Sequence, residues 1–163
     1  MPAKPTVSPS PSAVRQVVCA SPEATQALAA ALARVARAGD LIALEGELGA
    51  GKTQFAKGFG AGLGVTATIN SPSYVLMAEY EGRLPLFHLD LYRLDDAADA
   101  LSGGLLDERQ AAGVTLVEWA ERLGPALPAD RLEVAFSGSA DEPRTIRLTA
   151  TEPELERYLA ALP

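Results

Sequence analysis

Cysteine and long apolar runs are almost missing from this sequence. Its one cysteine, Cys19, excludes a disulfide within the chain, which suits a reducing cytosol. We expect Cys19 to pack as a small hydrophobic residue on an early strand. No apolar run approaches the roughly 20 residues that span a bilayer, and the Pro- and Ser-rich start lacks the apolar block of a secretory signal. These absences predict a cytoplasmic protein with no membrane partner.

Positive charge is also scarce. Lys and Arg number 14 against 21 Asp and Glu, which gives a net charge of −7 at pH 7. Proteins that grip nucleic acid by themselves usually carry a basic patch that neutralises phosphates, and none is visible here. The charge balance predicts no binding to DNA and no direct grip on RNA. Any link to RNA would run through a partner protein.

Strand and helix patterns alternate along the chain. Val14–Ala20 predicts a strand, and Ser21 is a good N-cap for a helix over Glu23–Ala38 that Gly39 closes. The remaining expected elements are a buried strand 40–45, a helix to about residue 63, a hairpin of 74–80 and 84–92, two short helices within 95–110, a buried strand 114–117, a hairpin of 131–137 and 144–149, and a closing helix 154–162. This order predicts an α/β fold around a mixed, mostly parallel sheet flanked by helices, with β-hairpin additions.

A glycine-rich motif follows the apolar strand 40–45 directly. Residues 46–53 read GELGAGKT and fit the phosphate-binding pattern G-x-x-x-x-G-K-[ST] without a mismatch. In such a loop the glycines let successive N–H groups face phosphate oxygens, while Lys52 reaches the β- and γ-phosphates and the Thr53 hydroxyl ligates Mg²⁺. The motif predicts ATP and Mg²⁺ as cofactors and one P-loop NTPase-like domain over residues 14–163, after a disordered Pro/Ser-rich tail over 1–13. An ordinary glycine-rich turn is the competing interpretation.

Two carboxylates are candidates for managing the metal. Glu118 ends the apolar run VTLV, where P-loop folds place a metal-binding acid, although an acid after a strand can also be a solvated strand end. Asp90 lies within the strand-like run LFHLDLYRL, where an unpaired carboxylate would be costly. A metal, Lys52, a water or a salt bridge with Arg93 could compensate. His88 shares the strand face of Asp90 and is expected to be a structural hydrogen-bonding residue; Tyr74, Tyr80 and Tyr92 could equally be core aromatics.

Four segments taken together resemble the TsaE family in content, order and spacing. They are GELGAGKT, then SPSY at 71–74, then HLDLYRL at 88–94, then LVEW at 116–119. The likeness runs from about Val18 to Leu123, and less distinctly into the last two expected strands. It implies a bacterial ATPase needed for N6-threonylcarbamoyladenosine at position 37 of tRNAs that read codons beginning with A. TsaE-like proteins work with the TsaB–TsaD complex, so tRNA would be contacted only indirectly.

The resemblance also implies roles for individual residues. Gly49, Ala50, Gly51, Lys52, Thr53 and Gln54 would bind the triphosphate, and Thr53 with Glu118 would hold Mg²⁺. Asp90 would take part in hydrolysis with Lys52, and whether Asp90 or Glu118 is the direct metal ligand stays open. Residues lining the nucleotide site would further include Ser73 and Tyr74 of a switch-like loop, Ser21, Trp119 and Glu121. The family usually has Thr where this chain has Ser73, which bears on the exact geometry of that loop.

Two other functions remain compatible with the same loop. A small-molecule P-loop kinase would need an arginine-rich lid, whereas Arg83, Arg93, Arg109 and Arg122 are scattered. A non-catalytic ATP-dependent assembly factor would bind ATP without turnover. A partner-stimulated ATP hydrolase is the preferred hypothesis.

Overall fold

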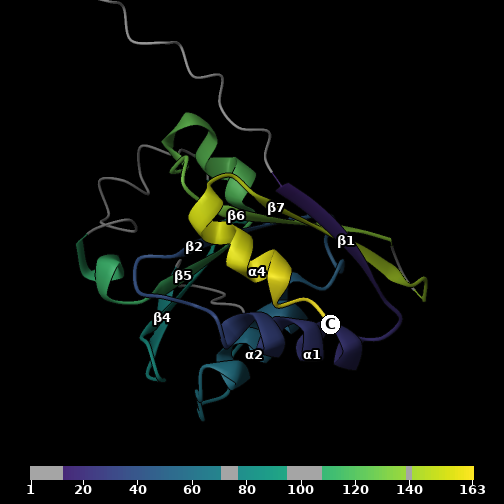
Figure 1. Cartoon of the computed structure of the whole chain (residues 1–163), viewed down its shortest axis with the longest axis horizontal. Coiled ribbons are helices and arrows are strands. Elements are labelled where there is room, and N and C mark those ends of the chain that lie inside the picture. The colour runs from purple at the N-terminus through teal and green to yellow at the C-terminus, as the bar shows by residue number, and fades with distance from the viewer. Residues whose placement is uncertain (1–12, 71–76, 95–107, 139–140) are drawn as a thin grey trace, which may run out of the picture.

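The structure is a computed structural model that describes residues 13–70, 77–94, 108–138 and 141–163. Its described strands form a seven-stranded sheet in the order β1-β7-β6-β2-β5-β4-β3 (Figure 1). The strands are β1 Ala13–Cys19, β2 Leu41–Glu45, β3 Met77–Tyr80, β4 Leu86–Asp90, β5 Val114–Glu118, β6 Leu132–Ser137 and β7 Arg144–Ala150. The helices are α1 Pro22–Ala33, α2 Lys52–Gly62 and α4 Glu156–Ala160, with 3₁₀ turns η1 Glu108–Ala112, η2 Ala120–Ala126 and η3 Pro153–Leu155.

The centre of the sheet is parallel and its edges are antiparallel. β2 pairs in parallel with β5 and β6, and β4 pairs in parallel with β5. The antiparallel pairs are β3 with β4, β6 with β7 and β1 with β7. The predicted mixed α/β sheet with β-hairpin additions is therefore confirmed, although parallel and antiparallel pairs are equally frequent among the described strands, with three of each. Because parallel strands end at one edge, the carboxyl ends of β2, β4 and β5 meet there and bring their loops together.

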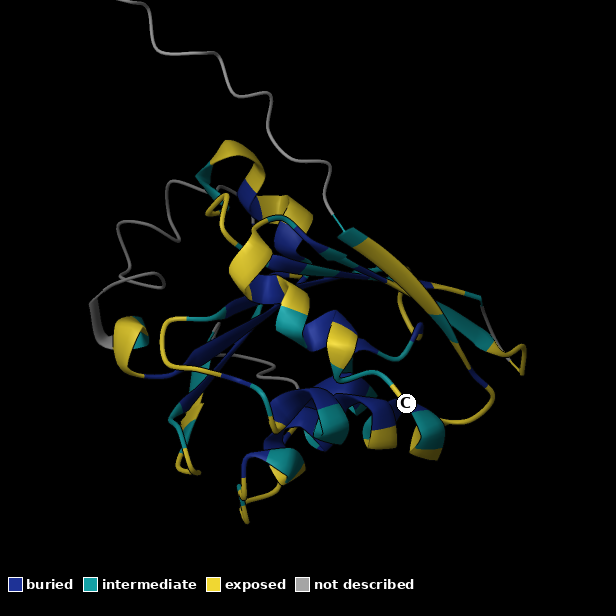
Figure 2. Ribbon diagram, in the orientation of Figure 1, coloured by how far each residue is buried: buried dark blue, intermediate teal, exposed yellow. Residues whose placement is uncertain are grey.

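Both faces of β2 are covered, which explains its uninterrupted apolar sequence. Ile42 and Leu44 lie in the larger core under α1, α2 and α4, whereas Leu41 and Ala43 lie in a second core that η2 covers. Figure 2 shows the buried residues concentrated in the sheet centre and on the inner sides of the helices. Among the described helices, none is both long and apolar enough to cross a membrane.

Helix α1 is shorter than its sequence pattern predicts. It ends at Ala33 instead of Ala38, and residues 34–36 continue in turns with bonds three residues back. Side chains from distant parts of the chain donate hydrogen bonds to the carbonyl groups at this end of the helix. Arg83 donates to Ala33 and Ala36, and Arg157 donates to Val35. These partners satisfy the carbonyls that a helix end leaves unpaired, so the helix can stop early. The start is as predicted, since Ser21 accepts the Ala24 N–H at 3.1 Å.

Other boundaries differ by small amounts. β1 begins at Ala13, the last residue of the predicted tail, and Cys19 is buried at its end as expected. The closing helix over 154–162 is divided into η3 and α4. The predicted tail over 1–12 and most of the predicted helices within 95–110 lie outside the described residues.

A nearly buried charge cluster fastens α4 to the turn before β2. The Asp40 carboxylate accepts bonds from the Arg157 guanidinium, the Tyr158 hydroxyl and the Arg37 N–H. The side chains of Asp40 and Arg157 are only 11% and 16% exposed. Burial, followed by the bond to Asp40, raises the pKa of Tyr158 well above its usual range, so this hydroxyl stays a donor.

We expect Asp40→Ala to lower the free energy of unfolding by roughly 3 kcal/mol, because it leaves a nearly buried guanidinium without its anion. Urea denaturation followed by circular dichroism measures the loss. Asp130→Ala is the matched control, since Asp130 is exposed and should change stability by less than about 0.5 kcal/mol. Equal losses in the two variants would contradict a fastening role for Asp40.

Candidate functional site

The glycine-rich segment forms a tight loop between β2 and α2. Gly46 and Gly51 have positive φ angles of 152° and 110°, which side chains rarely adopt. A Cβ on Gly46 would also lie 3.0 Å from the Cβ and the backbone oxygen of Phe136, so the loop passes unusually close to β6. Gly51 is the N-cap of α2 and has no capping side chain. The first N–H groups of α2 therefore point into the loop, which is the arrangement that binds anions.

The Lys52 side chain folds back into this loop. Its ammonium donates to the carbonyls of Gly46 at 2.5 Å and Glu47 at 2.8 Å, and lies 4.1 Å from the centre of the Trp119 ring. Lys52 is only 4% exposed. Burial lowers the pKa of this amine, and the carboxylates of Glu118, Glu121 and Asp90 oppose that effect. The loop thus encloses one positive charge beneath an aromatic ring.

Glu118 and Thr53 meet behind the loop. The Thr53 hydroxyl donates to Glu118 Oε1 at 3.1 Å, and Glu118 is only 2% exposed. The interpretation of Glu118 as a solvated strand end is therefore wrong. Its second oxygen, Oε2, lies 2.5 Å from Nε2 of the fully buried His88. The expected hydrogen-bonding role of His88 is confirmed, and its partner is the carboxylate of the candidate site.

Asp90 stands beside Glu118, because the two residues are paired in the β4–β5 register. It is the last residue of β4 and is half-buried, so it does not lie inside the strand as the sequence pattern suggested. Its Oδ1 accepts the Tyr92 N–H at 3.0 Å, a backbone partner that was not among the expected ones. Within the described part of the chain Asp90 and Arg93 form no salt bridge. Tyr92 is 43% exposed, and the centre of its ring lies 5.0 Å from the centre of the Trp119 ring. It is therefore not a core aromatic.

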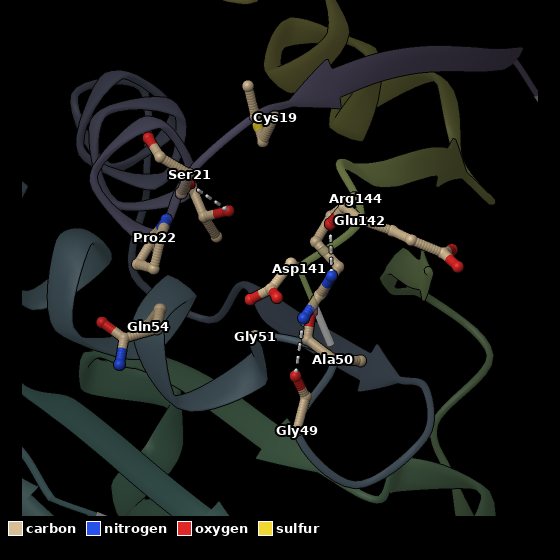
Figure 3. Close-up of a pocket in the computed structure, with 12 residues that line it drawn as sticks. Cys19, Ser21, Pro22, Gly49, Ala50, Gly51, Gln54, Asp141, Glu142 and Arg144 are labelled. Carbon is tan, nitrogen blue, oxygen red and sulfur yellow. Dashed lines mark hydrogen bonds between the residues drawn. The ribbon is translucent and has the colours of Figure 1, made fainter. Parts of the chain in front are cut away.

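A pocket of about 400 Å³ opens beside the loop. Figure 3 shows Ser21, Gln54 and Arg144 around it, with Gly49 and Ala50 at its base. Five of the predicted binding residues line this pocket: Ser21, Gly49, Ala50, Gly51 and Gln54.

The other predicted binding residues lie elsewhere. Trp119 covers Lys52 and does not line the pocket, and Glu121 is exposed on η2. Trp119 has a left-handed backbone, with φ 58° and ψ 42°, at the point where the chain leaves β5. Such a conformation is uncommon for a bulky residue. Ser73 and Tyr74 lie outside the described residues.

Arg144 is a site residue that sequence reasoning missed. From the start of β7 its guanidinium donates to the carbonyls of Ala50 and Gly49, both at 3.2 Å. It also donates to the Glu142 carbonyl at 2.5 Å. These contacts join residues about 95 positions apart, so no local pattern could indicate them. Arg144 braces the loop from the pocket side.

Comparisons with known proteins agree with this arrangement. Residues 19–146 match the family described as "Threonylcarbamoyl adenosine biosynthesis protein TsaE". A tRNA threonylcarbamoyladenosine biosynthesis protein TsaE from Bacillus subtilis is 45% identical over 80% of this chain and 82% of its own length. A protein of the same name from a Nostoc species is 38% identical over 82% of this chain and 85% of its own length.

A solved structure supports the same assignment. The crystal structure of Bacillus subtilis YdiB matches with a TM-score of 0.75 and 36% identity, and covers 91% of this chain and 93% of its own. The likeness therefore extends from the sequence to the fold. On this evidence the chain belongs to the TsaE family of threonylcarbamoyl adenosine biosynthesis proteins.

Proposed function

We propose that this chain is the ATPase subunit of tRNA threonylcarbamoyladenosine biosynthesis, binding Mg-ATP at Gly46–Thr53 and hydrolysing it in complex with TsaB and TsaD. The observation that carries the proposal is the contact of the Thr53 hydroxyl with Glu118 Oε1 at 3.1 Å, directly behind the loop. Family membership connects the site to tRNA modification. The net charge of −7 is in keeping with a tRNA surface supplied by partners.

The residues present fit a magnesium ion. Mg²⁺ takes octahedral oxygen ligands at about 2.1 Å, so neighbouring ligand oxygens lie about 3.0 Å apart. The observed 3.1 Å between Thr53 Oγ1 and Glu118 Oε1 agrees with that spacing. Among the described residues no group of three His, Cys, Asp or Glu side chains could hold a metal alone. Mg²⁺ does not need such a group, because it is usually bound by one or two carboxylates together with substrate phosphates and water. A bound Mg²⁺ would neutralise charge on the transferring phosphoryl group.

The chain's own groups would divide the remaining work. The N–H groups at the start of α2 and the Lys52 ammonium would hold the phosphates. Lys52 would exchange its bonds to the Gly46 and Glu47 carbonyls for bonds to phosphate, because a charged acceptor binds an ammonium more strongly. The half-buried Asp90 would orient the attacking water beside Glu118. The pocket of about 400 Å³ has room for a nucleoside. These roles leave Arg144 to fix the shape of the loop.

ATP hydrolysis tests the proposal directly. The purified chain is assayed alone and with TsaB and TsaD from the same organism, and tRNA modification is measured in parallel. We expect hydrolysis that rises when the partners are added. Hydrolysis indifferent to the partners would count against a TsaB–TsaD-stimulated ATPase and favour a screen of metabolites as phosphate acceptors. Modification without any turnover would favour a non-catalytic assembly factor.

Glu118→Gln should lower Mg²⁺-dependent turnover at least about a hundredfold. Mutating a residue that only hydrogen-bonds to a metal ligand already lowers metal affinity or activity about ten- to hundredfold. The amide keeps the shape of the side chain but not its charge. Nucleotide affinity measured in EDTA should stay unchanged. Glu152→Gln, an exposed position, is the control. An unchanged hydrolysis rate in Glu118→Gln would remove Glu118 from the site.

A further inference from the structure

His88 occupies a position that its packing alone does not explain. It lies in β4 two residues before Asp90, so both side chains are on the same face of the strand. The ring is fully buried, and its Nε2 atom lies 2.5 Å from Glu118 Oε2. Its other nitrogen, Nδ1, is the buried side-chain atom without a hydrogen-bond partner among the described residues.

The unpartnered nitrogen makes His88 an expensive core residue. A buried polar atom that loses its water without gaining a partner costs about 1–3 kcal/mol. A phenylalanine of similar shape would fill the same space without that cost. The fold therefore gains nothing from the imidazole at this position except the hydrogen bond to Glu118.

That bond decides how the Glu118 carboxylate is held. Oε1 accepts from the Thr53 hydroxyl and Oε2 lies against His88, so the two oxygens have separate partners. A carboxylate accepts hydrogen bonds, so Nε2 is the nitrogen that donates to Glu118. Removing His88 would leave Oε2 buried without this donor and would let the carboxylate rotate away from Thr53.

We propose that His88 is a positioning residue of the cation site, which donates Nε2–H to Glu118 Oε2 and thereby keeps Oε1 beside the Thr53 hydroxyl. This inference rests on the proposed function, which puts the cation at those two oxygens. It assigns His88 no contact with nucleotide or metal. His88 would then act like the residues in other metal sites that do not touch the metal but orient its ligands by hydrogen bonds.

The test measures metal affinity apart from turnover. Mn²⁺ is titrated into the full chain with a non-hydrolysable ATP analogue, and bound Mn²⁺ is followed by electron paramagnetic resonance. For His88→Phe we expect the Kd for Mn²⁺ to rise roughly ten- to hundredfold and the melting temperature to fall, because the buried Glu118 Oε2 loses its donor. Affinity for the analogue in EDTA should not change. His88→Gln, whose amide can donate to Glu118, should recover most of the Mn²⁺ affinity.

Each contrary outcome is distinguishable. Wild-type Mn²⁺ affinity in His88→Phe would overturn the positioning role while leaving the proposed function intact. If the phenylalanine variant does not fold, His88→Gln is compared with His88→Asn, whose amide is one methylene shorter, and equal Mn²⁺ affinity in that pair would overturn the role. A wild-type chain that binds neither the analogue nor Mn²⁺ would overturn the proposed function and this inference together.

Discussion

Lys52→Ala should abolish productive nucleotide binding and lower ATP hydrolysis by at least about a hundredfold, the typical loss when one preorganised charge partner of a transition state is removed. The loop encloses this ammonium between the Gly46 and Glu47 carbonyls and the Trp119 ring. The fold should survive. Because burial lowers the pKa of Lys52, the folded state disfavours its charge, and replacing it removes an unfavourable desolvation.

The sole tryptophan of the chain provides the measurement. Trp119 lies 4.1 Å from the Lys52 ammonium, so its fluorescence should report nucleotide entering the wild-type loop. Titration with ATP should change that signal in the wild type and leave it flat in Lys52→Ala. Lys57→Ala is the matched control, because Lys57 lies on the same helix outside the loop. Wild-type hydrolysis by Lys52→Ala would show that Gly46–Thr53 is not the nucleotide site.

Gly58→Ala should cost the fold about 2–3 kcal/mol, in the range of an overpacked core. α1 and α2 approach so closely at this point that a Cβ on Gly58 would lie 2.2 Å from the Gln26 backbone oxygen. Backbone atoms of a neighbouring helix cannot move aside without shifting α1. Since α2 begins at Lys52, the same shift would disturb the candidate site.

Gly60→Ala is the comparison that isolates this clash. A Cβ there would meet Ile69 Cδ1 at 2.0 Å, but that atom is the far end of a flexible side chain. Both changes gain the same helix propensity, about 1 kcal/mol. Urea denaturation should therefore rank Gly58→Ala well below Gly60→Ala in stability. If both variants were stabilised by about 1 kcal/mol, the close helix contact would be wrong.

Local patterns were sufficient to predict most elements of this fold. The uninterrupted apolar run of β2 indicates a strand covered on both faces, and Ser21 marks the start of α1 by a capping bond that depends only on neighbours in sequence. The glycine-rich motif predicts its own loop geometry, because Gly46 and Gly51 are needed for positive φ angles. The parallel order of β2 and β5 then places Glu118 behind that loop.

Contacts between distant segments could not be predicted in the same way. Arg144 donates to the Gly49 carbonyl, and Arg157 donates to the Val35 carbonyl just after α1. The partners in each contact are far apart in sequence, so no periodic pattern indicates them. The burial of Glu118 and its bond to His88 depend on how β4 and β5 align. Tyr92 could have been a core residue by composition, and only the turn after β4 leaves it exposed against Trp119.

The place of β2 in the sheet has a consequence for synthesis on the ribosome. β2 carries the loop early in the chain, but both of its neighbours, β5 and β6, are made much later. Domains generally form as units during translation, and pairings between distant segments are slow because the intervening chain must first be ordered. A nascent chain that stops before residue 137 has β2 with an incomplete neighbour, and one that stops before Arg144 lacks the brace on Gly49 and Ala50. The loop therefore gains its β6 neighbour and its Arg144 brace only once residues 132–144 have been made, although its motif is complete by residue 53.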